Sequence, residues 1–158
     1  MRRASLSRRS PPCSFVEECG TRANAMTTTP GTNVLRILLD SDALIAMVEG
    51  SDASHERATE IFRVLIARNA RLFIASTTVA EVITTLQRKY CHRSAAGDLY
   101  ERLLTHWVEV VLVDRDLISG AHAYYTSFGS KQNTIFDAIN IAAVKTYHLD
   151  AIFSFDRW

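Results

Sequence analysis

The stretch that most constrains the fold is 34–47, VLRILLDSDALIAM, which joins an apolar run to a carboxylate and then to a new apolar stripe. Five of the six residues in 34–39 are apolar, a pattern typical of a strand covered on both faces within a parallel sheet. The run ends at Asp40, and carboxylates are rarely buried without a partner. We therefore expect Asp40 at the carboxyl end of a central strand, where open α/β sheets bind their ligands.

Length and charge bound the class of protein. With 158 residues and 47% hydrophobic content, the chain fits one globular domain with a substantial core. Residues 1–33 hold five Arg and two Glu (net +3), which leaves 13 basic against 15 acidic residues in 34–158 (net −2). Bulk charge thus excludes a general polyanion-binding surface on residues 34–158, and any contact with nucleic acid must be local.

Cysteine usage and hydropathy indicate the compartment. The three cysteines, Cys13, Cys19 and Cys91, form no CxxC motif and are an odd number, so they predict neither a disulfide framework nor a zinc site. No apolar stretch is long enough to span a bilayer, and the Arg- and Ser-rich start lacks the apolar core of a secretory signal. We expect a cytoplasmic protein without a membrane partner.

Two segments differ in composition. Residues 1–33 are rich in Arg, Ser, Thr and Pro and show no hydrophobic period, so we expect a disordered N-terminal extension. Translation that starts at Met26 would explain this segment, and a nucleic-acid-binding arm is the alternative. Residues 34–158 form the expected folded domain.

Strand and helix patterns alternate along residues 34–158. The expected strands are 34–39, 72–75, 108–113 and 151–155, and helical stripes lie between them, near 44–47, 58–69, 79–86, 94–103, 117–128 and 134–147. Such alternation predicts an α/β fold with three α/β/α layers and a central parallel sheet.

Four carboxylates follow strands or open helices in this pattern: Asp40, Glu81, Asp137 and Asp156. Because the carboxyl ends of parallel strands share one edge, the fold would gather Asp40, Glu81 and Asp156 there, and Asp137 would join them if its helix starts at that edge. Taken singly, each acid also fits a helix cap, and Thr78-x-x-Glu81 and Thr134-x-x-Asp137 match the capping box.

Electrostatics argues against capping as the only role. Two carboxylates about 5 Å apart repel by roughly 3 kcal/mol at an effective dielectric near 20. Four such groups form six pairs, so the upper bound of about 20 kcal/mol exceeds the roughly 5–15 kcal/mol by which a domain is stable. The cluster must take up protons, spread apart or hold a cation, and oxygen ligands without Cys or His favour Mg²⁺ or Mn²⁺.

Four motifs, LLDSDALIA, STTVAEVI, FDAINIAA and IFSFDRW, resemble the acidic motifs of PIN-domain ribonucleases, specifically the VapC-like toxins of bacterial type II toxin–antitoxin pairs. The resemblance covers 34–158 and implies a three-layer PIN-like fold with Asp40, Glu81, Asp137 and Asp156 as the acidic quartet. It also implies a Mg²⁺- or Mn²⁺-dependent endoribonuclease that cuts RNA, a cognate antitoxin and a homodimer. The family pattern continues past the last motif, whereas this sequence ends at Trp158. From this difference we expect either a loosely closed site or a truncated reading frame.

The roles that we expect from this resemblance are specific. Asp40, Asp137 and Asp156 would hold the metal ion, and Glu81 would be a ligand through water or the holder of a second ion. Ser154 would bond a metal-bound water or a phosphate, although a plain strand hydroxyl is an equal alternative. Asp42 is a further supporting acid in this scheme, with a helix N-cap as its favoured role.

Three alternatives stay open at this point. Asp40-Ser-Asp42 after a buried strand also resembles the DxD motif of haloacid-dehalogenase-like phosphatases, with Asp40 as nucleophile and Asp42 as acid/base. A non-catalytic PIN-like binding module would use the acids as caps, and an antitoxin-independent nuclease would process or degrade RNA. A basic group, Arg88, Lys89, His92 and Arg93, would either contact phosphates or, as we favour, end a solvated helix.

Overall fold

The computed structural model describes residues 34–105, 107–127 and 134–156 of the chain. Contacts divide the chain into two units, Met1–Thr32 and Asn33–Trp158, and every element below belongs to the second. The expected N-terminal extension, 1–33, lies outside the described residues.

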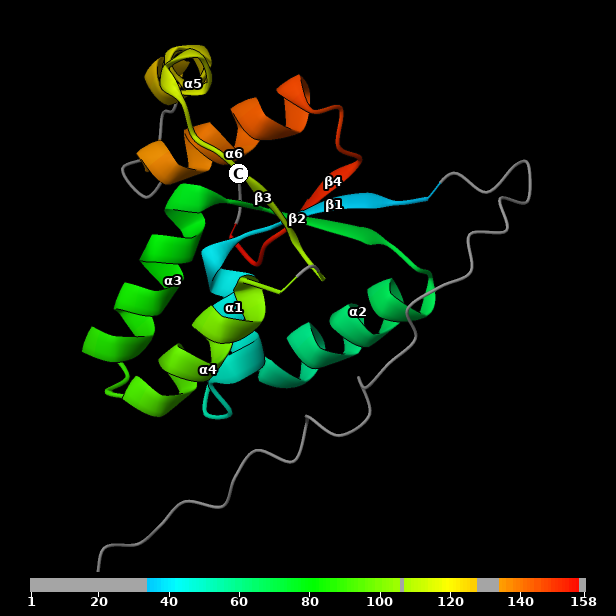
Figure 1. The fold of residues 1–158 in the computed structure, drawn as a ribbon, viewed down its shortest axis with the longest axis vertical. Helices are drawn as coiled ribbons and strands as arrows, with labels where there is room; N and C mark the ends of the chain where they lie inside the picture. Colours follow the sequence, from blue (N-terminus) through cyan, green and yellow to red (C-terminus); the bar gives the residue numbers. More distant parts are fainter. Residues whose placement is uncertain (1–33, 106, 128–133, 157–158) are drawn as a thin grey trace, which may run out of the picture. The chain divides into compact units, whose positions relative to one another are not determined.

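Strands and helices alternate as the hydrophobic pattern predicts (Figure 1). In chain order the elements are β1 (Arg36–Leu39), α1 (Ser41–Val48), α2 (His55–Ala67), β2 (Arg71–Ala75), α3 (Ser76–Arg88), α4 (Arg93–Leu103), β3 (Glu109–Val111), α5 (Arg115–Ser127), α6 (Ile135–Thr146) and β4 (Ala151–Phe153). Within the described part of the chain, no helix has the length and apolar character needed to cross a bilayer.

The four strands form one parallel sheet in the order β3-β2-β1-β4. The chain therefore builds the sheet outward from β1 to β3 and then returns to place β4 on the other side of β1. This reversal makes the carboxyl ends of β1 and β4 a topological switch point, which is where open α/β sheets bind ligands. Pairing continues to that point, because the Asp40 N–H donates to the Phe153 carbonyl at 3.1 Å.

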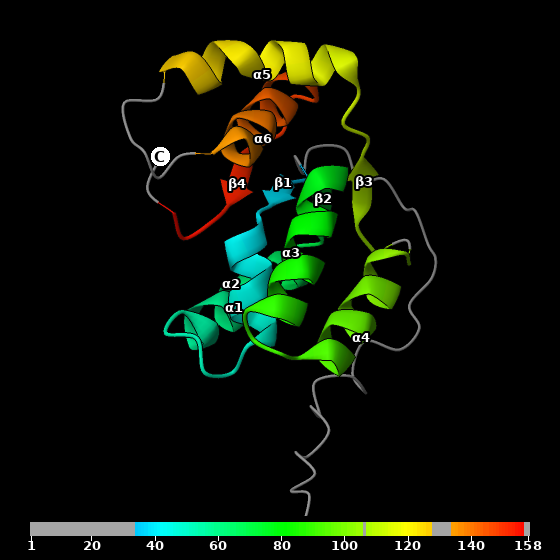
Figure 2. The ribbon, with the colours of Figure 1, turned by 90° about the vertical axis from the view of Figure 1, so that its left-hand side faces the viewer.

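Helices cover both faces of the sheet (Figure 2). Ile37 and Leu39 of β1 contribute to the core under α1–α4, while Leu38 between them contributes to the core under α5 and α6. All three side chains are at most 6% exposed. The predicted three-layer α/β/α fold and the strand buried on both faces are thus confirmed.

Several element boundaries differ from the prediction in ways that matter for the acids. β1 begins at Arg36 rather than at Val34, and β4 ends at Phe153, so that Asp156 lies in a turn after the strand. α3 begins at Ser76, directly after β2, and its N-cap is Ala75. The predicted capping box of Thr78 and Glu81 is therefore wrong, because both residues lie inside the helix.

Candidate active site at the sheet switch point

Asp40 occupies the junction between β1 and α1. It is only 3% exposed and serves as the N-cap of α1, with its Oδ1 accepting a hydrogen bond from the Ser41 N–H at 2.7 Å. Burial raises the pKa of Asp40 to about 7, and the nearby Asp42 carboxylate adds to the rise. The carboxyl group is thus held where its charge is costly, a condition that a cationic ligand would relieve.

Asp42 binds the turn that follows β4. Its Oδ2 accepts hydrogen bonds from the Phe155 N–H at 2.6 Å, the Asp156 N–H at 2.9 Å and the Ser154 hydroxyl at 3.2 Å. The favoured N-cap role for Asp42 is wrong, because Asp40 caps α1 and Asp42 lies in the first turn. Asp42 instead holds the turn of Ser154, Phe155 and Asp156 against the start of α1.

Ser154 is part of the same turn. Its hydroxyl donates to Asp42 and accepts from the Asp156 N–H at 3.0 Å. The exposed Asp156 therefore has its backbone held from two sides. In this arrangement the Ser154 hydroxyl orders the turn and is not a free strand hydroxyl.

Glu81 approaches from α3, on the side of β1 away from β4. Burial raises the pKa of Glu81, while hydrogen bonding from the Ser41 side chain lowers it. The charges of Asp137, Asp42 and Asp156 raise it further, so these three carboxylates lie within electrostatic range of Glu81. The second turn of α3, rather than its first, thus brings Glu81 to the switch point.

Asp137 comes from the first turn of α6. It forms a capping box with Thr134, and its Oδ2 accepts a hydrogen bond from the Thr134 N–H. Its charge also raises the pKa of Asp40 and of Glu81. The expected capping role and proximity to the other acids are therefore both present.

The structure brings the four predicted acids and Asp42 to the carboxyl-end edge of the sheet. Their side chains do not, however, form a complete set of metal ligands. Among the described residues, no three His, Cys, Asp or Glu side chains converge closely enough to hold a metal ion as they stand. The electrostatic effects link Asp40 with Asp42 and Asp137, Asp42 with Asp156, and Glu81 with three of these acids. These carboxylates thus raise the pKa values of Asp40, Asp42 and Glu81, but they lie too far apart to form a compact set of metal ligands.

Two buried carboxylate oxygens indicate whether a cation would suit these residues. Asp42 Oδ1 and Glu81 Oε2 are both shielded from solvent, and neither has a hydrogen-bond partner among the described residues. Burial also raises the pKa of the Asp42 carboxyl. Buried carboxylate oxygens without donors, in a group free of Cys and His, suit a hard divalent cation such as Mg²⁺ or Mn²⁺. The residues present therefore fit such an ion by their chemistry.

Comparison with known proteins places this arrangement in a family. The family model described as "PIN domain" matches residues 37–157, from β1 to beyond the turn that carries Asp156. The chain belongs to the PIN-domain family. The predicted family resemblance is confirmed. The phosphatase alternative loses its support, because the matched family is a different one.

Solved structures share the PIN fold of this chain at low sequence identity. The crystal structure of Mycobacterium tuberculosis VapC20, described as a sarcin-ricin loop cleaving toxin, is 22% identical with a TM-score of 0.67, covering 76% of this chain and 89% of that one. A toxin–antitoxin complex from Klebsiella pneumoniae is 18% identical with a TM-score of 0.50, covering 74% and 84%. Searching curated proteins finds no match.

Asn140 and Thr78 are two buried polar residues next to the site that the motifs of this PIN domain did not mark: Asn140 contacts Asp40, and Thr78 contacts Asn140. Asn140 Nδ2 donates to Asp40 Oδ1 at 3.0 Å, and the Thr78 hydroxyl donates to Asn140 Oδ1 at 3.3 Å. Two sequence signals could have identified them. Asn140 is a polar residue in an apolar helix, three residues after Asp137, and Thr78 precedes Val82 and Leu86 at spacings of four.

The basic group lies away from the acids. Arg88 and Lys89 lie 7 and 8 residues after Glu81 at the far end of α3, about 10 to 12 Å further along the helix axis. His92 Nδ1 instead lies 3.1 Å from the Glu49 carboxylate at the end of α1. This placement favours the solvated helix end over a phosphate contact beside the acids.

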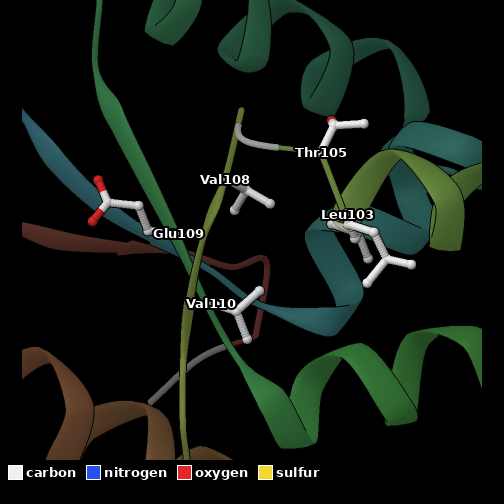
Figure 3. A pocket seen from close by; sticks show the side chains of 6 residues that line it. Leu103, Thr105, Val108, Glu109 and Val110 are labelled. Atoms are coloured by element: carbon white, nitrogen blue, oxygen red, sulfur yellow. The ribbon is translucent and has the colours of Figure 1, made fainter.

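A hollow lies beside β3, away from the acids (Figure 3). Its lining is Leu103, Leu104, Thr105, Val108, Glu109 and Val110. The single carboxylate in this lining, Glu109, is paired with Arg71 at 2.7 Å. The one hydroxyl of this lining, that of Thr105, donates to the Arg102 carbonyl at 2.6 Å, so the hollow offers no free acid and the candidate site stays at the switch point.

Proposed function

We propose that this PIN domain is a Mg²⁺- or Mn²⁺-dependent endoribonuclease and the toxin of a toxin–antitoxin pair. The observation that carries the proposal is the gathering of Asp40, Asp42, Glu81, Asp137 and Asp156 at the switch point, with buried carboxylate oxygens that lack donors. Family membership and the fold shared with a VapC toxin support it.

In the proposed site, Asp40, Asp137 and Asp156 would hold the ion. Glu81 would act through water or hold a second ion. The chemistry that a divalent cation supplies there, when bound, is acidification of a water molecule and neutralisation of the charge that develops on the phosphate. Asp42 and Ser154 hold the turn of Asp156, so they act on the orientation of a ligand residue.

The proposed partners follow from the same assignment. RNA is the substrate, and a cognate antitoxin holds the enzyme inactive in the cell, as the toxin–antitoxin complex that shares the fold suggests. A homodimer and a cytoplasmic location belong to the same proposal. An antitoxin-independent nuclease and a non-catalytic module are the alternatives that the experiment must separate.

The test compares the wild type with Asp137→Asn and with Asp98→Asn, which makes the same chemical change at an exposed site on α4. Purified proteins are incubated with total RNA and Mn²⁺, with EDTA as the metal-free arm. We expect discrete RNA fragments from the wild type and Asp98→Asn only in Mn²⁺. For Asp137→Asn we expect a loss of roughly 100-fold or more in rate, the scale found when one group that stabilises developing charge is removed.

The same variants, expressed from an inducible promoter, report on toxicity. Growth arrest with the wild type and Asp98→Asn, but not with Asp137→Asn, is the expected result. RNA cleavage in vitro without growth arrest would favour the antitoxin-independent nuclease. Equal RNA cleavage by Asp137→Asn and wild type would falsify the assignment of the acids, and no cleavage by any variant would favour the binding module.

A further inference from the structure

A chain of buried polar groups runs beneath Asp40. Asn140 is fully buried on α6 and donates from Nδ2 to Asp40 Oδ1 at 3.0 Å. Its Oδ1 accepts from the hydroxyl of Thr78 on α3, which is also fully buried, at 3.3 Å. We propose that Asn140 is a positioning residue that holds Asp40 ready for the divalent cation, and that Thr78 fixes the amide of Asn140. The inference rests on the proposed function.

The chemistry of the contact explains why an amide suits this place. In the ionised form that would hold a cation, the Asp40 carboxylate only accepts hydrogen bonds, which suits the observed orientation of the Asn140 amide, with its NH₂ toward Asp40 and its carbonyl toward the Thr78 hydroxyl. Asp40 Oδ1 then receives two donors, Asn140 Nδ2 and the Ser41 N–H. Two donors on one oxygen set the plane of the carboxylate and thereby the direction of its second oxygen.

The hydrogen bonds from Thr78 to Asn140 and from Asn140 to Asp40 also join the elements that carry three of the acids. Asn140 lies one turn after Asp137 on α6, and Thr78 lies one turn before Glu81 on α3. Asp40 stands between them at the end of β1. The hydrogen bonds Thr78–Asn140–Asp40 therefore cross-link α3, α6 and β1 directly beneath the site, and residues that orient metal ligands in this way typically change affinity 10- to 100-fold when lost.

A merely structural role for Asn140 makes a different prediction. Its neighbours in sequence on α6 are apolar and buried: Ala138, Ile139, Ala142 and Ala143. Replacing Asn140 alone leaves the Thr78 hydroxyl and one acceptor site of Asp40 without their partner, so some loss of stability is expected in either role. If Asn140 only filled the core, an apolar substitute would leave the affinity for a cation unchanged. Affinity for Mn²⁺ therefore separates the two roles.

The experiment measures Mn²⁺ binding to the purified full chain by isothermal titration calorimetry, with folding checked by circular dichroism in EDTA. Asn140→Leu removes the donor, Thr78→Val removes the hydroxyl, and Thr78→Ser restores it. Ile139→Val, on the same helix, removes a buried methylene without touching Asp40 and is the matched control for a perturbed core.

We expect the dissociation constant for Mn²⁺ to rise about 10- to 100-fold in Asn140→Leu and roughly 3- to 10-fold in Thr78→Val. Thr78→Ser and Ile139→Val should stay within about twofold of the wild type on the same grounds. Should Asn140→Leu fail to fold, the Val and Ser variants at Thr78 still decide the question, because they differ in the hydroxyl.

Unchanged affinity in Asn140→Leu, or equal affinities in Thr78→Val and Thr78→Ser, overturns the inference while the proposed function stands. A wild type that binds no Mn²⁺, or Asp40→Asn that binds as tightly as the wild type, overturns the proposed function and this inference together.

Discussion

At the scale of single residues, the buried Asp40 carboxyl makes stability depend on pH. Its pKa is raised from 3.8 to about 7 by burial and by the Asp42 charge. Between these values the folded state binds more protons than the unfolded state, so the free energy of unfolding of metal-free protein falls as pH rises from about 4 to about 7. The loss is at most about 4 kcal/mol, at 1.36 kcal/mol for each pKa unit.

Urea unfolding in EDTA at pH 5 and pH 8 measures this dependence. Asp40→Asn should flatten the profile and leave a smaller slope from Asp42 and Glu81, whose pKa values burial also raises. Asp98→Asn, on the exposed face of α4, should keep the wild-type profile. An equal fall in Asp40→Asn would show that Asp40 is not the titrating group.

Asp42 and Asp156 differ in what their side chains do, and substitutions should separate them. Asp42 accepts three hydrogen bonds from the turn after β4, so Asp42→Ala should lower the free energy of unfolding by about 1–3 kcal/mol. Asp156 is exposed, and Asp156→Asn should change stability by less than about 0.5 kcal/mol. Both variants should lose ribonuclease activity, since each affects the proposed ligand at Asp156.

Thermal unfolding in EDTA and RNA cleavage in Mn²⁺ are the two measurements for this pair. Full activity in Asp42→Ala would mean that the turn holds Asp156 without this carboxylate. A strong loss of stability in Asp156→Asn would instead give that side chain a structural role.

At the scale of elements, the first turn of α6 combines capping with a place in the site. Asp137 accepts from the Thr134 N–H, so Asp137→Asn, which keeps an amide oxygen as acceptor, should cost less than about 0.5 kcal/mol of stability while abolishing cleavage. Thr134→Ala should do the opposite: it should lower the free energy of unfolding by about 1 kcal/mol and retain RNA cleavage.

Denaturant unfolding and cleavage rates on the two variants check this division. If Thr134→Ala abolished cleavage at a temperature where it is folded, the cap would be essential for placing Asp137. If Asp137→Asn destabilised the protein as strongly as Thr134→Ala, its carboxylate would act mainly as a cap.

At the scale of the whole molecule, the proposed ion should stabilise the fold, because it binds the folded acids and not the dispersed ones. Mn²⁺ at 100 times its dissociation constant should raise the free energy of unfolding by about 2.7 kcal/mol. For a domain of this size the midpoint of thermal unfolding would rise on the order of 10 °C. Differential scanning fluorimetry with and without Mn²⁺ measures the shift.

Variants and a second cation sharpen that measurement. The shift should vanish in Asp40→Asn and persist in Asp98→Asn, because only the first removes a proposed ligand. A shift of the same size in both would assign the effect to ion binding elsewhere on the surface. Mg²⁺ should produce the same effect at higher concentration, as expected for a more strongly hydrated ion.

The local pattern of residues determined the α/β class, the parallel sheet and the carboxyl-end position of Asp40. An apolar run such as 34–39 can be buried only between two layers, and the alternation of strands with helices leaves few other topologies. The family motifs around Asp40, Glu81, Asp137 and Asp156 were also readable, since each lies within one short segment.

Tertiary structure decided the contacts between distant segments. Helix α3 begins at Ser76 and not after Thr78, because the chain turns directly out of β2, and this buries Thr78 where Asn140 can accept from it. Asp42 binds a turn 112–114 residues away, which no local propensity encodes. Periodicity reports which face of an element is buried, but partners across the core follow only from how the elements pack.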